Sequence, residues 1–416
     1  MEEVELKPPD TLHGQLQRGR GLGMRRALCE PDASELVYDC ILRDPREDHQ
    51  TETRTWFLAR AAVGMELSVR PIADHLFTPV EASGDDERRI DLAVDVLVDM
   101  ARSGRGDAVA PLHQYVAEGP YWHWVLDAMW ESGGPSMCQG LDGVVLARVD
   151  DAELYDAVDP AWGPWTAWSS TQPRVRAALQ SHRTHHAGTL PTAEQRRAEV
   201  ETATSAQLVA LARTRNRQAL AELGRRGDLV VLDLAEEHGI RTRFGTLPGL
   251  PRALNRLGSA ALRRARDWTT GGDPLLASAG ITVLAEHGGT DDIPVLLKAL
   301  TDAAQAGNWC ATEDPARGLG RLHAAQATPV LRDLWVTTTH SYARADILNG
   351  LRGAAPQDAG PYVDEAFDDC EPNVRQLACD AADPAMLTLV RARRDDPLED
   401  DEVRTAASNH LAGGSP

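Results

Sequence analysis

Tryptophan is concentrated in one part of the chain, where it could form a binding surface. Six of the ten Trp residues lie between positions 122 and 168. Trp and Tyr combine a large apolar area with a polar group, which suits stacking pockets and the centres of protein interfaces. The same side chains could instead fill a core where helices diverge. The candidate ligand-binding or partner-binding residues are Tyr121, Trp122, Trp124, Trp130, Trp162, Trp165 and Trp168.

Arginine forms a second group of side chains with a chemical use. Residues 171–270 contain seventeen Arg and nine acidic residues, a local net charge of +8 in a chain whose total is −20. Guanidinium groups bind phosphate and carboxylate through paired hydrogen bonds. The alternative is that these side chains are solvated or pair with acids of the same chain. The candidate contacts to phosphate or to an acidic partner are Arg213, Arg215, Arg217, Arg263, Arg264 and Arg266.

No motif in the sequence points to catalysis, a metal or a cofactor. His182, His185 and His186 lie close together, but no adjacent Cys or carboxylate completes a set of metal ligands. The six cysteines are scattered without a close pair. Nucleophile elbows, Walker loops and a dinucleotide-binding glycine loop are absent as motifs. We therefore expect no catalytic residue, no metal and no cofactor.

Charge and hydropathy narrow the class of protein. The net charge of −20 disfavours a nucleic-acid coat protein or a membrane-surface protein. No apolar run is long enough to span a membrane, and the first twenty residues are polar and acidic rather than signal-like. We expect a cytoplasmic protein that makes no contact with a membrane.

The helices that must position these residues are indicated by an internal repeat. The segments LAELGRRGDLVVL at 220–232 and LAEHGGTDDIPVL at 284–296 match at seven of thirteen positions, and a third copy, LGRLHAAQATPVL, lies at 319–331. Each copy contains the end of one apolar helix, a short turn and the start of the next helix. Such pairs bury their apolar faces only when neighbours stack on them. The leucines expected to be buried are Leu220, Leu232, Leu284, Leu296, Leu319 and Leu331.

The first half of the chain repeats less regularly. Residues 86–102 form a strongly amphipathic helix, with apolar residues at three- and four-residue spacing on one face, namely Ile90, Ala93, Val94, Leu97 and Met100. No segment alternates between polar and apolar residues as a strand does. The sequence therefore predicts an all-α protein with a helical content above roughly two-thirds.

This pattern of helical pairs resembles the HEAT-like repeat family of α-solenoids, over about residues 215–390 and less clearly over 35–130. The resemblance implies a superhelix of stacked helical pairs. We expect a lead-in at 1–34, which its glycines and basic residues suggest is flexible. It is followed by an irregular HEAT-like segment with a Trp-rich break at 35–187, a repeat segment at 188–412 and a frayed tail at 413–416.

HEAT-like folds host unrelated functions, so the fold alone does not define the activity. Repeat arrays offer extended concave surfaces. The sequence therefore favours a non-enzymatic scaffold that presents a concave surface to a protein partner. Two alternatives stay open. One is a nucleic-acid-associated protein related to HEAT-like DNA glycosylases, and the other is a small-molecule enzyme or binding module that uses the Trp-rich region.

Overall fold

A computed structural model gives the fold of the chain. It describes residues 4–46, 48–78, 86–186, 193–242 and 247–413. Helices account for 74% of the structure, and no strand occurs within these ranges, which confirms the all-α prediction. Within the same ranges, every helix is too short or too polar to cross a lipid bilayer. Residues 414–416 of the predicted tail and the predicted boundary between residues 187 and 188 fall outside the described part.

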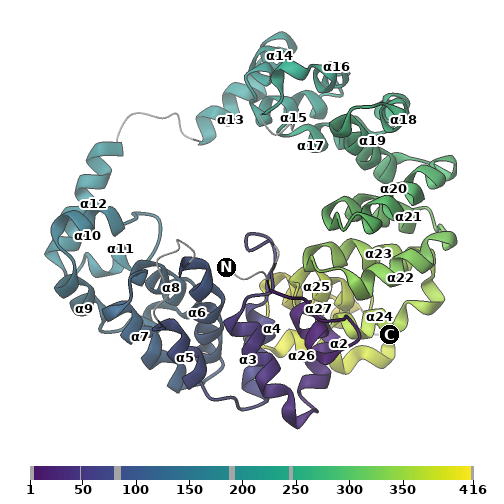
Figure 1. Cartoon of the computed structure of the whole chain (residues 1–416). Coiled ribbons are helices and arrows are strands. Elements are labelled where there is room, and N and C mark those ends of the chain that lie inside the picture. The colour runs from purple at the N-terminus through teal and green to yellow at the C-terminus, as the bar shows by residue number, and fades with distance from the viewer. Residues whose placement is uncertain (1–3, 47, 79–85, 187–192, 243–246, 414–416) are drawn as a thin grey trace. The chain divides into compact units, whose positions relative to one another are not determined.

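Figure 1 shows the α-helices in their order along the chain. They are α1 Leu12–Gln17, α2 Gly21–Ala27, α3 Ser34–Leu42, α4 Thr55–Gly64, α5 Arg70–Leu76, α6 Asp86–Arg102, α7 Val109–Glu118, α8 Trp122–Met137, α9 Leu141–Arg148, α10 Asp151–Ala157, α11 Trp165–Trp168, α12 Pro173–His186, α13 Ala193–Thr202, α14 Ser205–Arg213, α15 Arg217–Arg225, α16 Val230–Glu236, α17 Leu250–Leu257, α18 Leu262–Thr270, α19 Pro274–His287, α20 Ile293–Gln305, α21 Glu313–Arg321, α22 Thr328–Thr337, α23 Arg344–Ala354, α24 Gly360–Ala366, α25 Pro372–Asp380, α26 Leu387–Asp395 and α27 Asp401–Gly413.

Short 3-10 helices precede or join many of these helices. They are η1 Pro31–Ala33, η2 Gly106–Ala108, η3 His238–Ile240, η4 Gly258–Ala261, η5 Thr290–Asp292, η6 Trp309–Thr312, η7 Ala325–Ala327, η8 Ser341–Ala343, η9 Pro356–Asp358 and η10 Pro384–Met386.

The chain folds into two compact units. The first consists of residues 1–189 together with 363–416, and the second of residues 190–362. The C-terminal segment thus belongs to the same unit as the N-terminal half. The candidate Trp residues lie in the first unit and the candidate Arg residues in the second.

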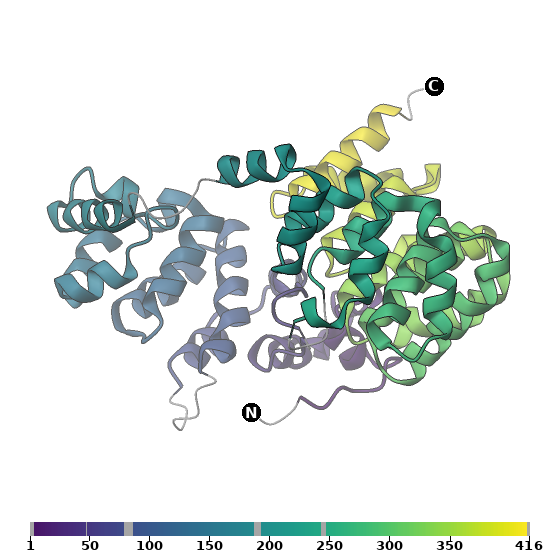
Figure 2. The same cartoon turned by 90° about the horizontal axis from the view of Figure 1, so that it is seen from above.

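The second unit is built from helical pairs that follow one another along the chain (Figures 1 and 2). The first helices of successive pairs, α15, α17, α19, α21 and α23, contact one another in chain order. The six leucines predicted from the repeat are all buried, with exposed fractions of 6% or less. The prediction that these leucines are buried is therefore confirmed.

Small residues allow these helices to approach closely. A Cβ atom on Gly353 of α23 would lie 2.1 Å from the carbonyl oxygen of Gly320 on α21. A Cβ on Gly318 would lie 2.6 Å from the Cα of Ala285 on α19. Any larger residue would have to push the helix backbones apart. The spacing of these pairs is therefore set by glycine and alanine as well as by the buried leucines.

The first unit is organised around α6. This helix contacts α3, α4, α5, α7 and α8. The five residues predicted to form its apolar face are all buried, and Leu92, Val96 and Val98 on its other sides are buried as well. A helix that is apolar on most of its circumference occupies the interior of a domain. Asp91, Asp95 and Asp99 therefore lie within the apolar part of this helix.

The ends of the first unit meet each other. The segment expected to be a flexible lead-in forms α1 and α2, and the amide of Cys370 donates a 2.9 Å hydrogen bond to the carbonyl oxygen of Gly19. Gly19 has φ +65°, and a Cβ there would lie 2.4 Å from the sulfur of Cys370. Arg20 and Glu365 form an ion pair of 2.9 Å at the same junction. Only glycine fits this close approach.

We predict that Leu296→Ala lowers the free energy of unfolding of the second unit by about 2–5 kcal/mol, because it leaves a cavity at a fully buried site. Urea unfolding followed by circular dichroism measures the change. Leu229→Ala provides a matched control, since Leu229 is 53% exposed and its loss should cost less than about 0.5 kcal/mol. Equal effects of the two substitutions would contradict the packing described above.

Candidate functional site

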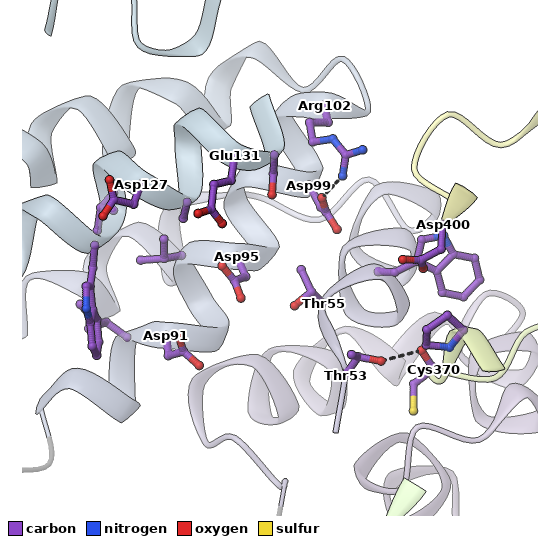
Figure 3. Close-up of a pocket in the computed structure, with 18 of the residues that line it drawn as sticks. Thr53, Thr55, Asp91, Asp95, Asp99, Arg102, Asp127, Glu131, Cys370 and Asp400 are labelled. Carbon is purple, nitrogen blue, oxygen red and sulfur yellow. Dashed lines mark hydrogen bonds and ion pairs between the residues drawn. The ribbon is translucent and has the colours of Figure 1, made fainter. Parts of the chain in front are cut away.

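A pocket of about 520 Å³ opens in the first unit between α6, α8 and the C-terminal segment (Figure 3). Helices α6 and α8 form one side of it. The chain around Thr53 and Thr55 and the segment that includes Cys370 and Asp400 form the other. Six carboxylates line the pocket, against two arginines, Arg102 and Arg375. The pocket is therefore rich in carboxylates.

Three of these carboxylates come from α6. Asp91, Asp95 and Asp99 are spaced four residues apart, which places them along one side of the helix. Asp91 pairs with Arg46 at 3.0 Å, and Asp99 pairs with Arg102 at 2.7 Å. Asp95, between them, has no hydrogen bond or ion pair with any residue that the structure describes.

Helix α8 contributes the aromatic group and two more carboxylates. Trp124, Asp127 and Glu131 lie at three- and four-residue spacing and all line the pocket. The Oδ1 atom of Asp127 is buried and has no hydrogen-bond partner among the described residues, and Glu131 likewise forms no ion pair with them. The ring of Trp124 is 39% exposed. This helix thus adds two carboxylates without partners beside an accessible indole.

The opposite side of the pocket is fixed by buried charges. The guanidinium of Arg375 is fully buried, donates to Glu399 at 2.6 Å and lies 3.9 Å from the ring centroid of Trp56. The guanidinium of Arg375 also forms an ion pair with Asp400 at 3.1 Å. This ion pair holds the Asp400 carboxylate at the edge of the pocket. Because its donors are already engaged, Arg375 does not neutralise the carboxylates of α6 and α8.

The protonation of the pocket carboxylates reflects this environment. Burial, reinforced by the charge of Asp91, raises the pKa of Asp95 to about 7. Burial and the nearby Glu131 raise the pKa of Asp127 to about 6. The pKa values of Asp99 and Asp400 are also raised by burial. A cation in the pocket would favour the ionised forms, so its binding would release protons.

The arrangement suits an organic cation better than a single metal ion. Metal ligands converge on one point, but the only group of three or more such ligand atoms within 4.8 Å of one another in the described ranges lies in the second unit. The pocket carboxylates are instead distributed along two helices. An ammonium or guanidinium group on a flexible chain can contact several of them and also lie against the Trp124 ring.

The Trp residues predicted to form a site separate into two groups. Trp122 and Trp165 are buried and meet edge to face at 6.3 Å, and Trp165 meets Trp168 in the same way at 5.5 Å. These three belong to the core together with the partly buried Tyr121 and Trp130. Trp124 and Trp162 are exposed, and only Trp124 of these two lines the pocket.

The candidate Arg residues are largely engaged with neighbouring helices. Arg213 pairs with Glu237, Arg264 with Glu236 and Asp233, and Arg266 with Asp292, at distances of 2.6 to 2.9 Å. The Nε of Arg215 donates to a backbone carbonyl. Arg217 and Arg263 are exposed and form no ion pair with the described residues. A phosphate would therefore have to displace existing partners at half of the six positions.

Of the predicted histidine group, the structure describes the side chain of His182. Its Nε2 atom lies 2.7 Å from the carbonyl oxygen of Tyr155, and its ring stacks on the Tyr155 ring at 4.2 Å. The side chains of His185 and His186 lie outside the described residues. His182 thus packs between two helices of the first unit.

The pocket aspartates were missed by the sequence analysis. The signal was present, because Asp91, Asp95 and Asp99 recur every four residues within the otherwise apolar stretch 90–101. A stripe of one charge on a helix that is buried on most sides must face a partner or a cavity. The contribution of Cys370, Arg375 and Asp400 has no local signal, since they lie about 270–310 residues further along the chain.

Comparisons with protein-family models, curated proteins and solved structures found no match to this chain.

We predict that Asp95→Asn stabilises the protein more at neutral pH than at acidic pH. A raised pKa means that the folded chain binds the Asp95 proton more tightly than the unfolded chain does. Stability is then lost as the pH rises from about 4 to about 7. Asparagine does not titrate and escapes this loss. Urea unfolding at about pH 5 and pH 8 measures the difference.

Asp74→Asn provides the control for this measurement. Asp74 is exposed in the same unit and lies away from the pocket. Its substitution should have a small effect that is similar at both pH values. A stabilisation by Asp95→Asn that is equal at the two pH values, or larger at acidic pH, would contradict the described environment of Asp95.

Proposed function

We propose that the chain is a HEAT-like helical-repeat binding protein, and that its acidic pocket receives a positively charged segment of a protein partner. The repeat form is supported by helical pairs whose first helices contact one another in order and whose repeated leucines are buried. In this proposal the protein carries out no chemical step. It recognises its partner by charge and shape.

The observation that carries the proposal is the set of carboxylates without partners. Asp95, Asp127 and Glu131 line one pocket and form no hydrogen bond or ion pair with a cationic side chain of the described residues. Asp95 and Asp127 are half-buried, and carboxylates in such positions are normally paired, because removing an unpaired charge from water is costly. Glu131 is exposed and adds a carboxylate at the solvent side of the pocket. A lysine or arginine side chain of a partner would supply the missing charge.

Trp124 supports a protein partner rather than a free ion. Its indole is accessible beside Asp127 and Glu131, and tryptophan is enriched among the residues that dominate the binding energy of protein interfaces. The aliphatic part of a lysine or arginine side chain can lie on the ring while its head group reaches the carboxylates. The pocket is large enough for more than one such side chain.

The alternative functions have less support. Nucleic acid would be repelled by the pocket, and three of the six candidate Arg residues are already paired with carboxylates. An enzyme is the second alternative, since Asp95 and Asp127 titrate close to neutral pH and could exchange protons with a bound molecule. Such an enzyme would turn over a small cationic molecule, whereas the proposed protein only binds a partner.

We predict that a tetra-lysine peptide, acetylated only at its N-terminus, binds the full chain. Asp95→Asn combined with Glu131→Gln should weaken this binding by about tenfold or more, because each substitution removes a carboxylate that faces the ligand. Isothermal titration calorimetry measures the affinity. Binding should also weaken as salt is added, since part of the attraction is screened. Trp124→Leu should weaken binding without changing the salt dependence.

The matched control removes the same two charges elsewhere in the first unit. Asp74→Asn combined with Glu35→Gln alters exposed residues that do not line the pocket, and it should leave the affinity within about twofold of the original. Equal loss in both double variants would mean that only net charge matters. Spermidine binding as tightly as the peptide would favour the small-molecule alternative.

A further inference from the structure

A second group of chemically active side chains lies in the second unit, separate from the pocket. Cys310 is in η6, Glu313 begins α21, and His340 comes immediately before η8. Helices η6 and η8 are in contact, as are α21 and α23. The three residues are therefore brought together where two successive helical pairs begin.

The geometry of this group fits a shared ligand. The sulfur of Cys310, a carboxylate oxygen of Glu313 and a ring nitrogen of His340 all lie within 4.8 Å of one another. Around a tetrahedral zinc ion with ordinary bond lengths, such atoms would be about 3.5 Å apart. A movement of about 1 Å by the side chains would close the difference. His340 is buried, Glu313 is half-buried and Cys310 is exposed, so the group opens to solvent on the cysteine side.

The surroundings of the group are negative. Arg317, one turn after Glu313 on α21, forms ion pairs with Glu286, Asp314 and Asp346. One guanidinium thus faces three carboxylates, and the carboxyl group of Glu313 lies on the same helix one turn before it. Such a field attracts a divalent cation and opposes an anion.

The donor atoms select the kind of cation. Thiolate sulfur and imidazole nitrogen suit zinc and neighbouring transition metals, whereas magnesium and calcium require oxygen ligands. Three protein ligands leave a fourth position on a tetrahedral ion for water or an external group. We propose that Cys310, Glu313 and His340 form a binding site for a zinc-like divalent metal ion with one open position.

The proposed site is independent of the acidic pocket. Its ligands come from two helical pairs, so a bound ion would link the start of α21 to the start of α23. No metal was expected from the sequence. The three ligands are spaced by three and 27 residues, which matches no familiar zinc motif. Only the stacking of one pair on the next brings the ligands together.

Cobalt substitution tests the proposal on the full chain. The protein is stripped with a chelator, dialysed and titrated with Co²⁺, and the absorption spectrum is recorded. A cobalt–thiolate charge-transfer band that saturates at one equivalent, and that Zn²⁺ removes by competition, is the expected result. Cys310→Ser should abolish this band, and Glu313→Gln and His340→Gln should each weaken Zn²⁺ binding by about tenfold or more.

Cys29→Ser provides the matched control, since Cys29 is the other exposed cysteine of the chain. It should keep both the band and the affinity for zinc. Cys310 is exposed, so its substitution should leave the circular-dichroism spectrum unchanged even if the buried His340 variant fails to fold. Absence of the band, or a band that persists in Cys310→Ser, would overturn the proposal.

Discussion

The first unit depends on a network of buried charges that joins the segment around Arg54 to the segment around Arg375. Arg375 lies fully buried between Glu399 and the ring of Trp56, and Arg54 is fully buried between Glu52 and Glu371. Loss of one partner in such a network leaves an uncompensated charge inside the protein, which typically costs about 3–5 kcal/mol. The network therefore specifies which segments must meet. In doing so it places Thr53, Cys370 and Asp400 opposite the carboxylates of α6 and α8, so the acidic pocket depends on the same contacts.

The second unit is held together in a different way. Its helical pairs approach through glycine and alanine, as at Gly320 and Gly353, and bury the repeated leucines between them. Across the pairs, arginines bind carboxylates about 25–30 residues away in sequence, as Arg266 does with Asp292 and Arg317 with Asp346. The arginine excess of this region therefore serves in part to connect neighbouring pairs. The same stacking brings Cys310 to Glu313 and His340.

Local patterns in the sequence predicted the helices well. The repeat at Leu284–Leu296 fixes the register of the pairs, and the spacing of Ile90, Val94 and Leu97 identifies the buried face of α6, because burial imposes these periods on any helix. The candidate tryptophans were predicted less well. Core and surface use the same residue type, so composition could not separate Trp165 from Trp124.

The contacts that make the sites are long-range and had no local signal. Nothing near Thr53 in the sequence indicates that it will meet Cys370, and nothing near Cys310 indicates His340. Such pairings follow from how the helices stack. The aspartate stripe of α6 is the exception, because a charged residue at every fourth position of a buried helix can be recognised from the sequence alone.

Hydrogen exchange with and without saturating tetra-lysine peptide tests the central claim most directly, because it reports where the ligand binds. If the pocket receives a basic segment, exchange should slow in α6 and α8 and also in the segments around Thr53 and Asp400, which complete the pocket from distant parts of the chain. Slower exchange confined to the second unit, or no change in the pocket segments at saturation, would contradict the account.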